Sequence, residues 1–156
     1  MVVNDIHLDL KGYKGESKDA KYTNTIQVEN FSFGVRSPYD VATGLSAGKR
    51  HWDTLTIVKR TDSATPLLIK ALTENALVSK GTLTARKAGG GQQDYFTVDL
   101  ENVRVVSFSI SSPDSELPKE TVQLSFSKIT VTYQEQTPSG PTGGPITTVD
   151  DLTSQK

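Results

Sequence analysis

Few side chains in this sequence are suited to catalysis or metal binding. His7 and His51 are the only histidines, and there is no cysteine. A zinc site would therefore need both histidines together with carboxylates. Each histidine lies in an expected strand beside polar residues, which favours a surface or ordinary hydrogen-bonded role over metal binding or catalysis. The sequence predicts no metal site, and it can form no disulfide.

Other short motifs resemble chemical signatures but lack a decisive feature. The glycines at 89–91 are not followed by Lys-Ser/Thr as in a phosphate-binding loop, and two expected strands flank them, which favours a hairpin turn. Residues 16–19 (ESKD) contain a Ser-Lys pair, but adjacent side chains on a strand or turn point apart. The acidic residues at 114–116 and 150–151 lack the alternating spacing of a calcium loop. We therefore expect no catalytic residue and no cofactor.

Composition bounds the class of protein. The 156 residues fit one domain, with 35% hydrophobic and 22% charged residues, as in a soluble globular protein. A formal charge of −1 gives no electrostatic reason to expect nucleic acid or an anionic membrane as a partner. No stretch is long and apolar enough for a membrane span. Residues 1–7 lack the pattern of a secretory signal, so we expect synthesis in the cytoplasm and any export by another route.

Period-two alternation predicts most of the strands. Ile6, Leu8 and Leu10 form the buried side of a first strand. Across residues 25–35 the apolar phase changes near Asn30, which predicts a bulge or a move from one sheet to another. A further strand is expected through Trp52, Leu55, Ile57 and Val58. Later strands are expected near 77–87, 93–100, 103–110 and 120–133, with a turn at 101–102 and a bulge or bend within the last.

Two segments interrupt this pattern. Residues 36–48 contain Pro38 and two glycines and predict a long extended loop, a kind of segment that tends to be functional. One short helix is expected with Thr65 as N-cap, Pro66 at its first position, and Leu68, Ala71 and Leu72 on one stripe. Together the elements predict a mainly β fold: an antiparallel β-barrel or two-sheet sandwich with one short α-helix and a long extended loop.

Composition changes near the end of the chain. Residues 134–156 are rich in proline and glycine and poor in large apolar groups. We expect a β-barrel domain over residues 1–133 and a flexible C-terminal tail over 134–156, which is either disordered or laid over the barrel surface. The tail is too short for an appended toxin domain.

Six segments, in collinear order, resemble the haemolysin-coregulated protein (Hcp) family, the tube subunit of the bacterial type VI secretion system. They are residues 14–19 (KGESKD), 31–35 (FSFGV), 47–49 (AGK), 63–68 (SATPLL), 86–90 (RKAGG) and 124–133 (LSFSKITVTY). Any one of these would be weak alone, but together they cover nearly the whole chain. The resemblance implies a non-enzymatic structural protein whose hexameric rings stack into a hollow tube.

The same resemblance implies partners: other copies of the chain, the sheath and spike of the secretion machine, and small effector proteins carried in the lumen. It also implies assembly in the cytoplasm followed by export without a signal peptide. Two alternatives stay open. A non-catalytic β-sandwich binding module for carbohydrate or a cell-surface partner would show an aromatic patch, although Trp52 and the tyrosines are better explained as core or interface aromatics. An enzyme would show a cleft with paired carboxylates of shifted pKa.

Candidate contact residues follow from position. If Phe31, Phe33 and Val35 face the core, Asn30 and Ser32 face the other way. In the family this strand resembles one that lines the lumen, so Asn30 and Ser32 are candidates for effector contact, the alternative being a merely solvated face. For ring stacking the candidates come from the long loop and the turn at 87–91: Ser37, Tyr39, Asp40, Lys87, Gly89 and Gly90.

Overall fold

Antiparallel strands dominate the computed structural model, which describes residues 4–87, 94–112, 117–137, 140–141 and 144–153. One helix interrupts them. In order, the elements are β1 (Asn4–Leu10), β2 (Ile26–Val28), β3 (Asn30–Ser32), β4 (Val35–Arg36), β5 (His51–Trp52), β6 (Leu55–Arg60), α1 (Thr65–Thr73), β7 (Val78–Lys87), β8 (Asp94–Ser111), β9 (Lys119–Ser125), β10 (Lys128–Tyr133), β11 (Gln136–Thr137), β12 (Gly140–Pro141) and β13 (Ile146–Asp151).

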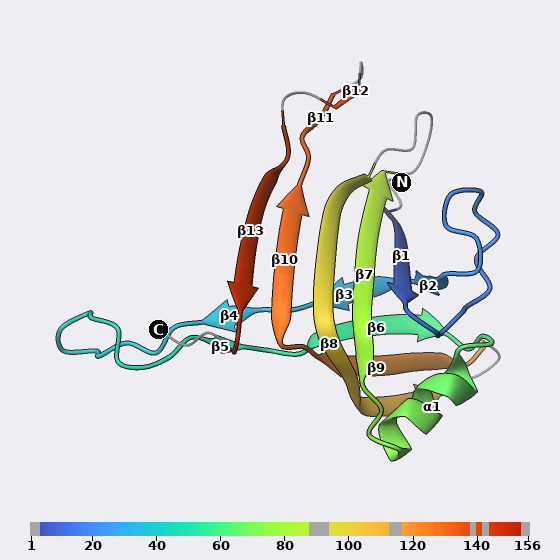
Figure 1. The fold of residues 1–156 in the computed structure, drawn as a ribbon, viewed down its shortest axis with the longest axis horizontal. Helices are drawn as coiled ribbons and strands as arrows, with labels where there is room; N and C mark the ends of the chain where they lie inside the picture. Colours follow the sequence, from blue (N-terminus) through green and yellow to red (C-terminus); the bar gives the residue numbers. More distant parts are fainter. Residues whose placement is uncertain (1–3, 88–93, 113–116, 138–139, 142–143, 154–156) are drawn as a thin grey trace.

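The strands form one continuous path that returns to its starting point. The order is β2-β1-β7-β8-β9-β6-β3, with β10 paired to β8 and β13 to β10. In Figure 1, β13, β10, β8, β7 and β1 stand side by side, and β9, β6 and β3 cross beneath them. Only Glu29 separates the two ends of the path, and its N–H donates to the carbonyl of Val58 at 2.8 Å. The mainly β fold predicted from the sequence, with one short helix and a long loop, is confirmed.

Apolar side chains from the strands that stand side by side and from the strands that cross them meet in one core. Ile6, Leu8 and Leu10 are buried on β1, as their alternation predicts. Strands β6 and β9 contribute in the same way, with every second residue buried. α1 covers part of this core through Leu68 and Ala71. In the part of the chain that the structure describes, no helix is long and apolar enough to cross a membrane.

At the change of apolar phase near Asn30, the chain changes its pairing partner from one strand to another. β2 pairs with β1, whereas β3, which is separated from β2 by the single residue Glu29, pairs with β6. The predicted bend in the last long strand is a similar change, because β9 pairs with β6 and β8 while β10 pairs with β8 and β13. Because of these changes in pairing partner, consecutive strands contribute side chains to the core from different sides.

The predicted turn at 101–102 is wrong. β8 runs through it as a single strand of 18 residues. Asn102 has a φ of 54°, a left-handed conformation that asparagine tolerates better than most residues. Glu101 still pairs with Lys80 and Lys128. The polar Glu-Asn pair therefore marks a bend, before which β8 pairs with β7 and β10; beyond it, β8 pairs with β7 only at Val103 and then with β9.

The helix begins one residue earlier than predicted, at Thr65. Ala64 is the N-cap, without a side-chain capping bond, and Thr65 is already helical. The hydroxyl of Thr65 instead donates to the Glu120 carboxylate, which is fully buried. Lys59, also fully buried, donates to Glu120 at 2.8 Å and lies 3.0 Å from Asp62. A tertiary contact in the core thus replaces the local cap that the sequence predicted.

The segment 14–19 begins with a close backbone approach. A Cβ atom on Gly15 would lie 2.6 Å from the carbonyl oxygen of Thr25 and 2.7 Å from the Cα of Ile26, so only glycine fits. The Gly15 N–H donates to the carbonyl of Asn24 at 2.9 Å. Glycine at this position therefore lets residues 11–25 fold back tightly against the start of β2.

Part of the C-terminal segment lies in the sheet. β13 pairs with β10 over six residues, from Lys128↔Asp151 to Tyr133↔Ile146. Residues 146–151, within the segment expected to be a flexible tail, form an edge strand of the sheet. β-branched residues at 146–149 explain the pairing, because they favour an extended chain despite the surrounding prolines and glycines.

Candidate functional site

The outer face of four neighbouring strands carries two uncharged rows of side chains, beyond which lie Arg60 and Lys119. Register aligns two rows of side chains across β3, β6, β9 and β8. We call them the polar face: Asn30, Val58, Thr121 and Ser109 in one row, and Ser32, Thr56, Gln123 and Ser107 in the other. All eight are exposed or partly exposed, whereas their strand neighbours Ile57, Val122 and Leu124 are buried. A surface of small hydrogen-bonding groups can contact many polypeptides without requiring a particular charge.

The predicted positions of Asn30 and Ser32 hold in part. Both are exposed, and Phe31 and Phe33 are partly buried against the core. Val35, however, is 51% exposed, because it lies in the β4–β5 hairpin outside the main sheet, so its predicted core position is wrong. Sequence reasoning missed Thr56, Thr121 and Gln123, because their place in the rows of Asn30 and Ser32 depends on the pairing register between distant strands.

An aromatic row packs beside the core rather than forming an open platform. Phe31, Phe33 and Phe96 stack with centroid distances of 6.0–6.4 Å. Trp52 stacks on Phe33 at 6.4 Å and meets Phe126 edge-on at 6.1 Å. All five are partly buried against the hydrophobic core. This packing favours the interpretation as core aromatics over a sugar-binding platform.

The extended loop, residues 36–48, projects from the domain beyond β4 and β5 (Figure 1). Its tip exposes Tyr39 (65%), Val41 (87%) and Leu45 (68%). Asp40 shapes the tip: its N–H donates to the carbonyl of Leu45 at 2.7 Å and its carboxylate accepts from the N–H of Ala42 at 2.8 Å. Exposed apolar groups on a projecting, internally bonded loop are typical of a contact surface.

The stacking candidates do not gather at one place. Ser37 and Tyr39 lie exposed on the extended loop, near Ser46, whose hydroxyl is 3.5 Å from that of Ser37. Lys87 is exposed at the end of β7, away from the loop in Figure 1. Gly89 and Gly90 lie outside the described residues. Contacts between identical copies that repeat head to tail need two different surfaces, and two separated sites are compatible with that.

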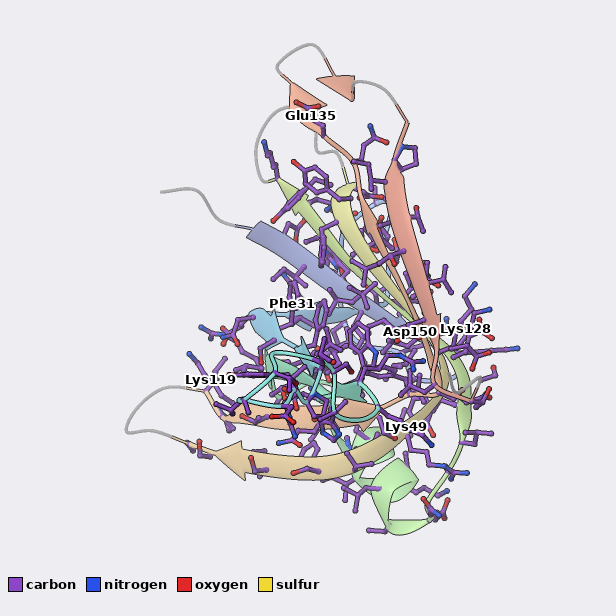
Figure 2. All side chains as sticks on the ribbon, turned by 90° about the vertical axis from the view of Figure 1, so that its left-hand side faces the viewer. Phe31, Lys49, Lys119, Lys128, Glu135 and Asp150 are labelled. Atoms are coloured by element: carbon purple, nitrogen blue, oxygen red, sulfur yellow. The ribbon has the colours of Figure 1, made fainter. Side chains whose placement is uncertain are left out.

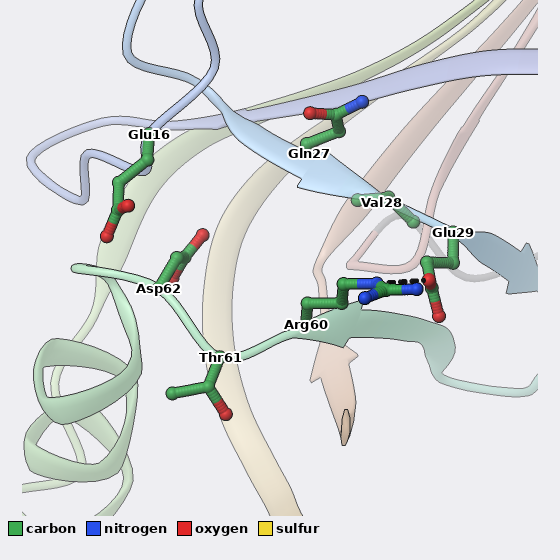
Figure 3. Close-up of a pocket in the computed structure, with 7 residues that line it drawn as sticks. All are labelled: Glu16, Gln27, Val28, Glu29, Arg60, Thr61 and Asp62. Atoms are coloured by element: carbon green, nitrogen blue, oxygen red, sulfur yellow. Dashed lines mark hydrogen bonds and ion pairs between the residues drawn. The ribbon is translucent and has the colours of Figure 1, made fainter. Parts of the chain in front are cut away.

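A groove of about 540 Å³ lies between residues 16–29 and the end of β6 (Figure 3). Its lining includes three carboxylates, those of Glu16, Glu29 and Asp62. Arg60 donates to Glu29 at 2.9 Å and, by this hydrogen bond, lowers the pKa of Glu29 below its usual range. Asp62 is paired with Lys59. Arg60 thus favours the ionised form of Glu29, which suits ion pairing, whereas a general acid needs a raised pKa.

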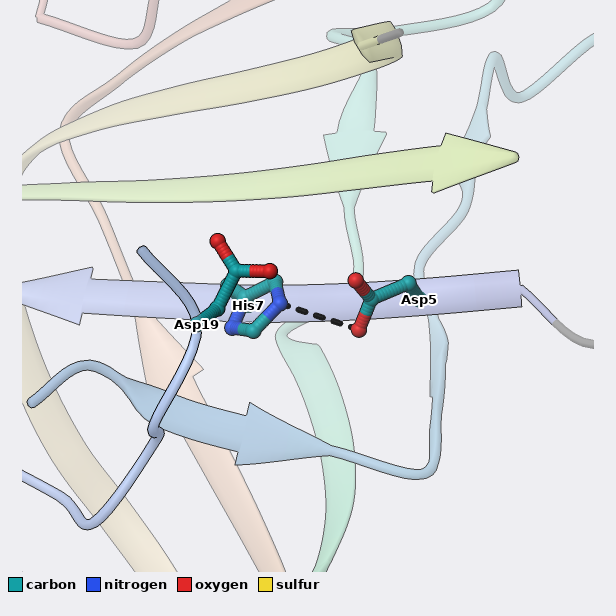
Figure 4. A group of neighbouring side chains, drawn as sticks. All are labelled: Asp5, His7 and Asp19. Atoms are coloured by element: carbon teal, nitrogen blue, oxygen red, sulfur yellow. Dashed lines mark ion pairs between the residues drawn. The ribbon is translucent and has the colours of Figure 1, made fainter. Parts of the chain in front are cut away.

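Asp5, His7 and Asp19 approach one another closely enough to resemble a metal site (Figure 4). His7 lies 2.9 Å from Asp5 through Nε2 and 3.1 Å from the Thr25 hydroxyl through Nδ1. Arg86 donates to both carboxylates and lowers the pKa of Asp19 to about 2. The guanidinium already supplies the positive charge that a metal would bring.

Further side chains around this cluster also join residues 17–25 to the sheet. Tyr22 stacks on the His7 ring at 5.0 Å and donates to Asp94 at 2.6 Å. Lys21 also donates to Asp94, at 2.8 Å. The network therefore fastens residues 17–25 to β1, β7 and β8. His51 is exposed on β5, 3.8 Å from Asp53, so the structure does not bring the two histidines together.

Comparisons with known proteins agree with these features. The family model described as "Type VI secretion system effector, Hcp" matches residues 7–133. The chain is 33% identical to Protein hcp1 of Pseudomonas aeruginosa over 147 residues, covering 91% of each. It is 27% identical to the Major exported protein of that organism, covering 81% of this chain and 78% of the relative. The crystal structure of Hcp1 from Salmonella typhimurium is similar, with a TM-score of 0.81, 28% identity and coverage of 99% and 98%.

Proposed function

Because the chain belongs to the Hcp family of type VI secretion tube proteins, we propose that its copies close into hexameric rings, that the rings stack into a hollow tube, and that the lumen carries small effector proteins. The observation that best supports the last step is the polar face, whose two uncharged rows of side chains span four strands. Facing the lumen, it would let unrelated cargo pass without strong electrostatic binding.

The family is structural and non-catalytic. The partners proposed here are therefore other copies of the chain, the sheath and spike of the secretion machine, and effectors. Assembly takes place in the cytoplasm and the tube then leaves the cell without a signal peptide. A relative named Major exported protein supports export. Residues 1–133 form the tube domain in this proposal, which agrees with the extent of the family match.

Closed rings and open stacks need two kinds of heterologous contact. We assign the contact between rings to the extended loop of one subunit and to the end of β7 with residues 87–91 of the next. The exposed Tyr39, Val41 and Leu45 supply apolar contact area on the loop. The lateral contact within a ring uses other surfaces of the domain.

Ring formation is tested directly by native mass spectrometry of the purified protein. We expect mainly six-subunit species at micromolar concentration and low salt, and annular particles with a central hole in negative stain. Dilution should dissociate the ring, because association is concentration dependent. A monomer under these conditions would contradict the proposed function.

Enlarging the polar face at Ser32 tests the lumen assignment. Ser32→Gln adds a longer side chain beside Thr56 without touching a core residue. Co-purification of a co-expressed small effector of the same secretion system should fall by about tenfold, which corresponds to about 1.4 kcal/mol of binding free energy. The ring itself should be unchanged in native mass spectrometry.

The matched control is Ser79→Gln, the same substitution at an exposed position on β7, outside the polar face. It should leave effector co-purification at the wild-type level. Equal amounts of effector on the Ser32→Gln and wild-type rings would remove Ser32 from the proposed lumen contact.

A further inference from the structure

One carboxylate ties the base of the extended loop to the edge strand β13. Arg50, at the end of the loop, donates through Nε and Nη2 to the two oxygens of Asp150, with Nη2 at 2.6 Å from Oδ1. The same Nη2 also donates to the carbonyl of Asp151 at 3.1 Å. Trp52 Nε1 donates to Asp150 Oδ2 at 2.7 Å. We call Arg50, Trp52 and Asp150 the clamp; Figure 2 labels Asp150, on β13.

The clamp has the geometry of a strong ion pair. A guanidinium that meets both oxygens of a carboxylate forms two charge-assisted hydrogen bonds in a fixed orientation. The side chains of Arg50 and Asp150 are only 29% and 25% exposed, so solvent screens them less than a surface pair. The hydrogen bond from Arg50 lowers the pKa of Asp150, which keeps the carboxylate ionised at neutral pH.

The base of the extended loop lies outside the main sheet. Its base is the hairpin of β4 and β5, which pairs Val35 with Trp52 and Arg36 with His51 and does not join the main sheet. A two-stranded hairpin of this length is marginally stable without further packing. The Trp52 ring packs on Phe33 and Phe126, and the clamp adds the polar contact to β13.

We propose that Asp150 is a positioning residue for tube assembly: by clamping Arg50 and Trp52 it holds the extended loop in the orientation needed for contact between rings. The inference rests on the proposed role of the loop in stacking. β13 thereby supports the extended loop, and a segment near the C-terminus controls a contact made by residues 36–48. Because Asp150 contacts the base of the loop, it orients the tip through the β4–β5 hairpin.

Asp150→Asn tests the clamp, because asparagine keeps the side-chain size but loses the charge and one acceptor oxygen. We expect hydrogen exchange of the amide protons within the loop, such as those of Asp40 and Ala47, to become at least about tenfold faster in isolated rings. The melting temperature and exchange in β1 and β7 should stay unchanged. Asp9→Asn, the same change at an exposed site on β1, should leave the exchange rates in the loop and the melting temperature unchanged.

Tube formation is the second measurement. Asp150→Asn should give intact rings but fewer and shorter tubes, and a variant with a shortened loop should gain no further defect when Asp150→Asn is added. Unchanged exchange in the loop would overturn the clamp. Faster exchange with normal tubes would overturn its role in assembly. If the loop-shortened variant itself builds normal tubes, the stacking role of the loop fails, while the exchange experiment still decides whether Asp150 orders the loop.

Discussion

Lys59→Met should lower the free energy of unfolding by about 3–5 kcal/mol, because removing one partner of a buried ion pair leaves the other charge uncompensated. Lys59 and Glu120 are both fully buried, and the lysine donates to Glu120 at 2.8 Å. After the substitution, Thr65 remains as the hydrogen-bond donor to Glu120. Urea unfolding at a fixed protein concentration, far from ring dissociation, measures the change.

The double variant Lys59→Met with Glu120→Leu should recover part of this loss, because it removes the buried charge of Glu120, while the Asp62 carboxylate still loses its ion pair with Lys59. Glu29→Gln is the control at an exposed pair, since Glu29 accepts from Arg60 near the surface, and its cost should be about 0–1 kcal/mol. A loss below about 1 kcal/mol for Lys59→Met would show that the pair contributes no more than a surface ion pair.

Shortening the extended loop should abolish tubes and leave rings intact. The N–H of Ala47 donates to the carbonyl of Pro38 at 2.9 Å, so residues 39–46 can be replaced by an Asn-Gly turn that closes the same hairpin. This removes Tyr39, Val41 and Leu45, which expose most of their surface. Negative-stain imaging scores tubes, and native mass spectrometry scores rings. Loss of the ring would place the loop in the lateral contact instead.

Two controls separate loop length from contact chemistry. Replacing Tyr39, Val41 and Leu45 together by serine keeps the length and removes the apolar groups, so tubes should again be lost. Leu117→Ser removes a comparably exposed apolar side chain (64%) outside the loop, and tubes should persist. Normal tubes in the triple variant would show that the apolar tip does not form the contact.

Local chemistry by itself determined much of this protein. Alternation along single strands predicted the buried residues of β1, and the change of phase at Asn30 predicted the transfer between strands, because both signals lie within a few residues of chain. The length and composition of residues 36–48 predicted the projecting loop. The six family segments identified the family, and the match over residues 7–133 confirmed it.

Long-range pairing decided what the sequence could not. The predicted cap at Thr65 was wrong because Glu120, far along the chain, accepts a hydrogen bond from the Thr65 hydroxyl. The predicted turn at 101–102 was wrong because β8 keeps strand partners on both sides through its bend.

The surfaces depended on tertiary structure in the same way. Ser32 was recognisable from its own strand, but its neighbours Thr56, Gln123 and Ser107 follow only from the register of four strands. The clamp joins Arg50 to Asp150 across one hundred positions of sequence. Neither residue has a local pattern that predicts the other, since a side chain's partner across a sheet is set by how the whole chain closes.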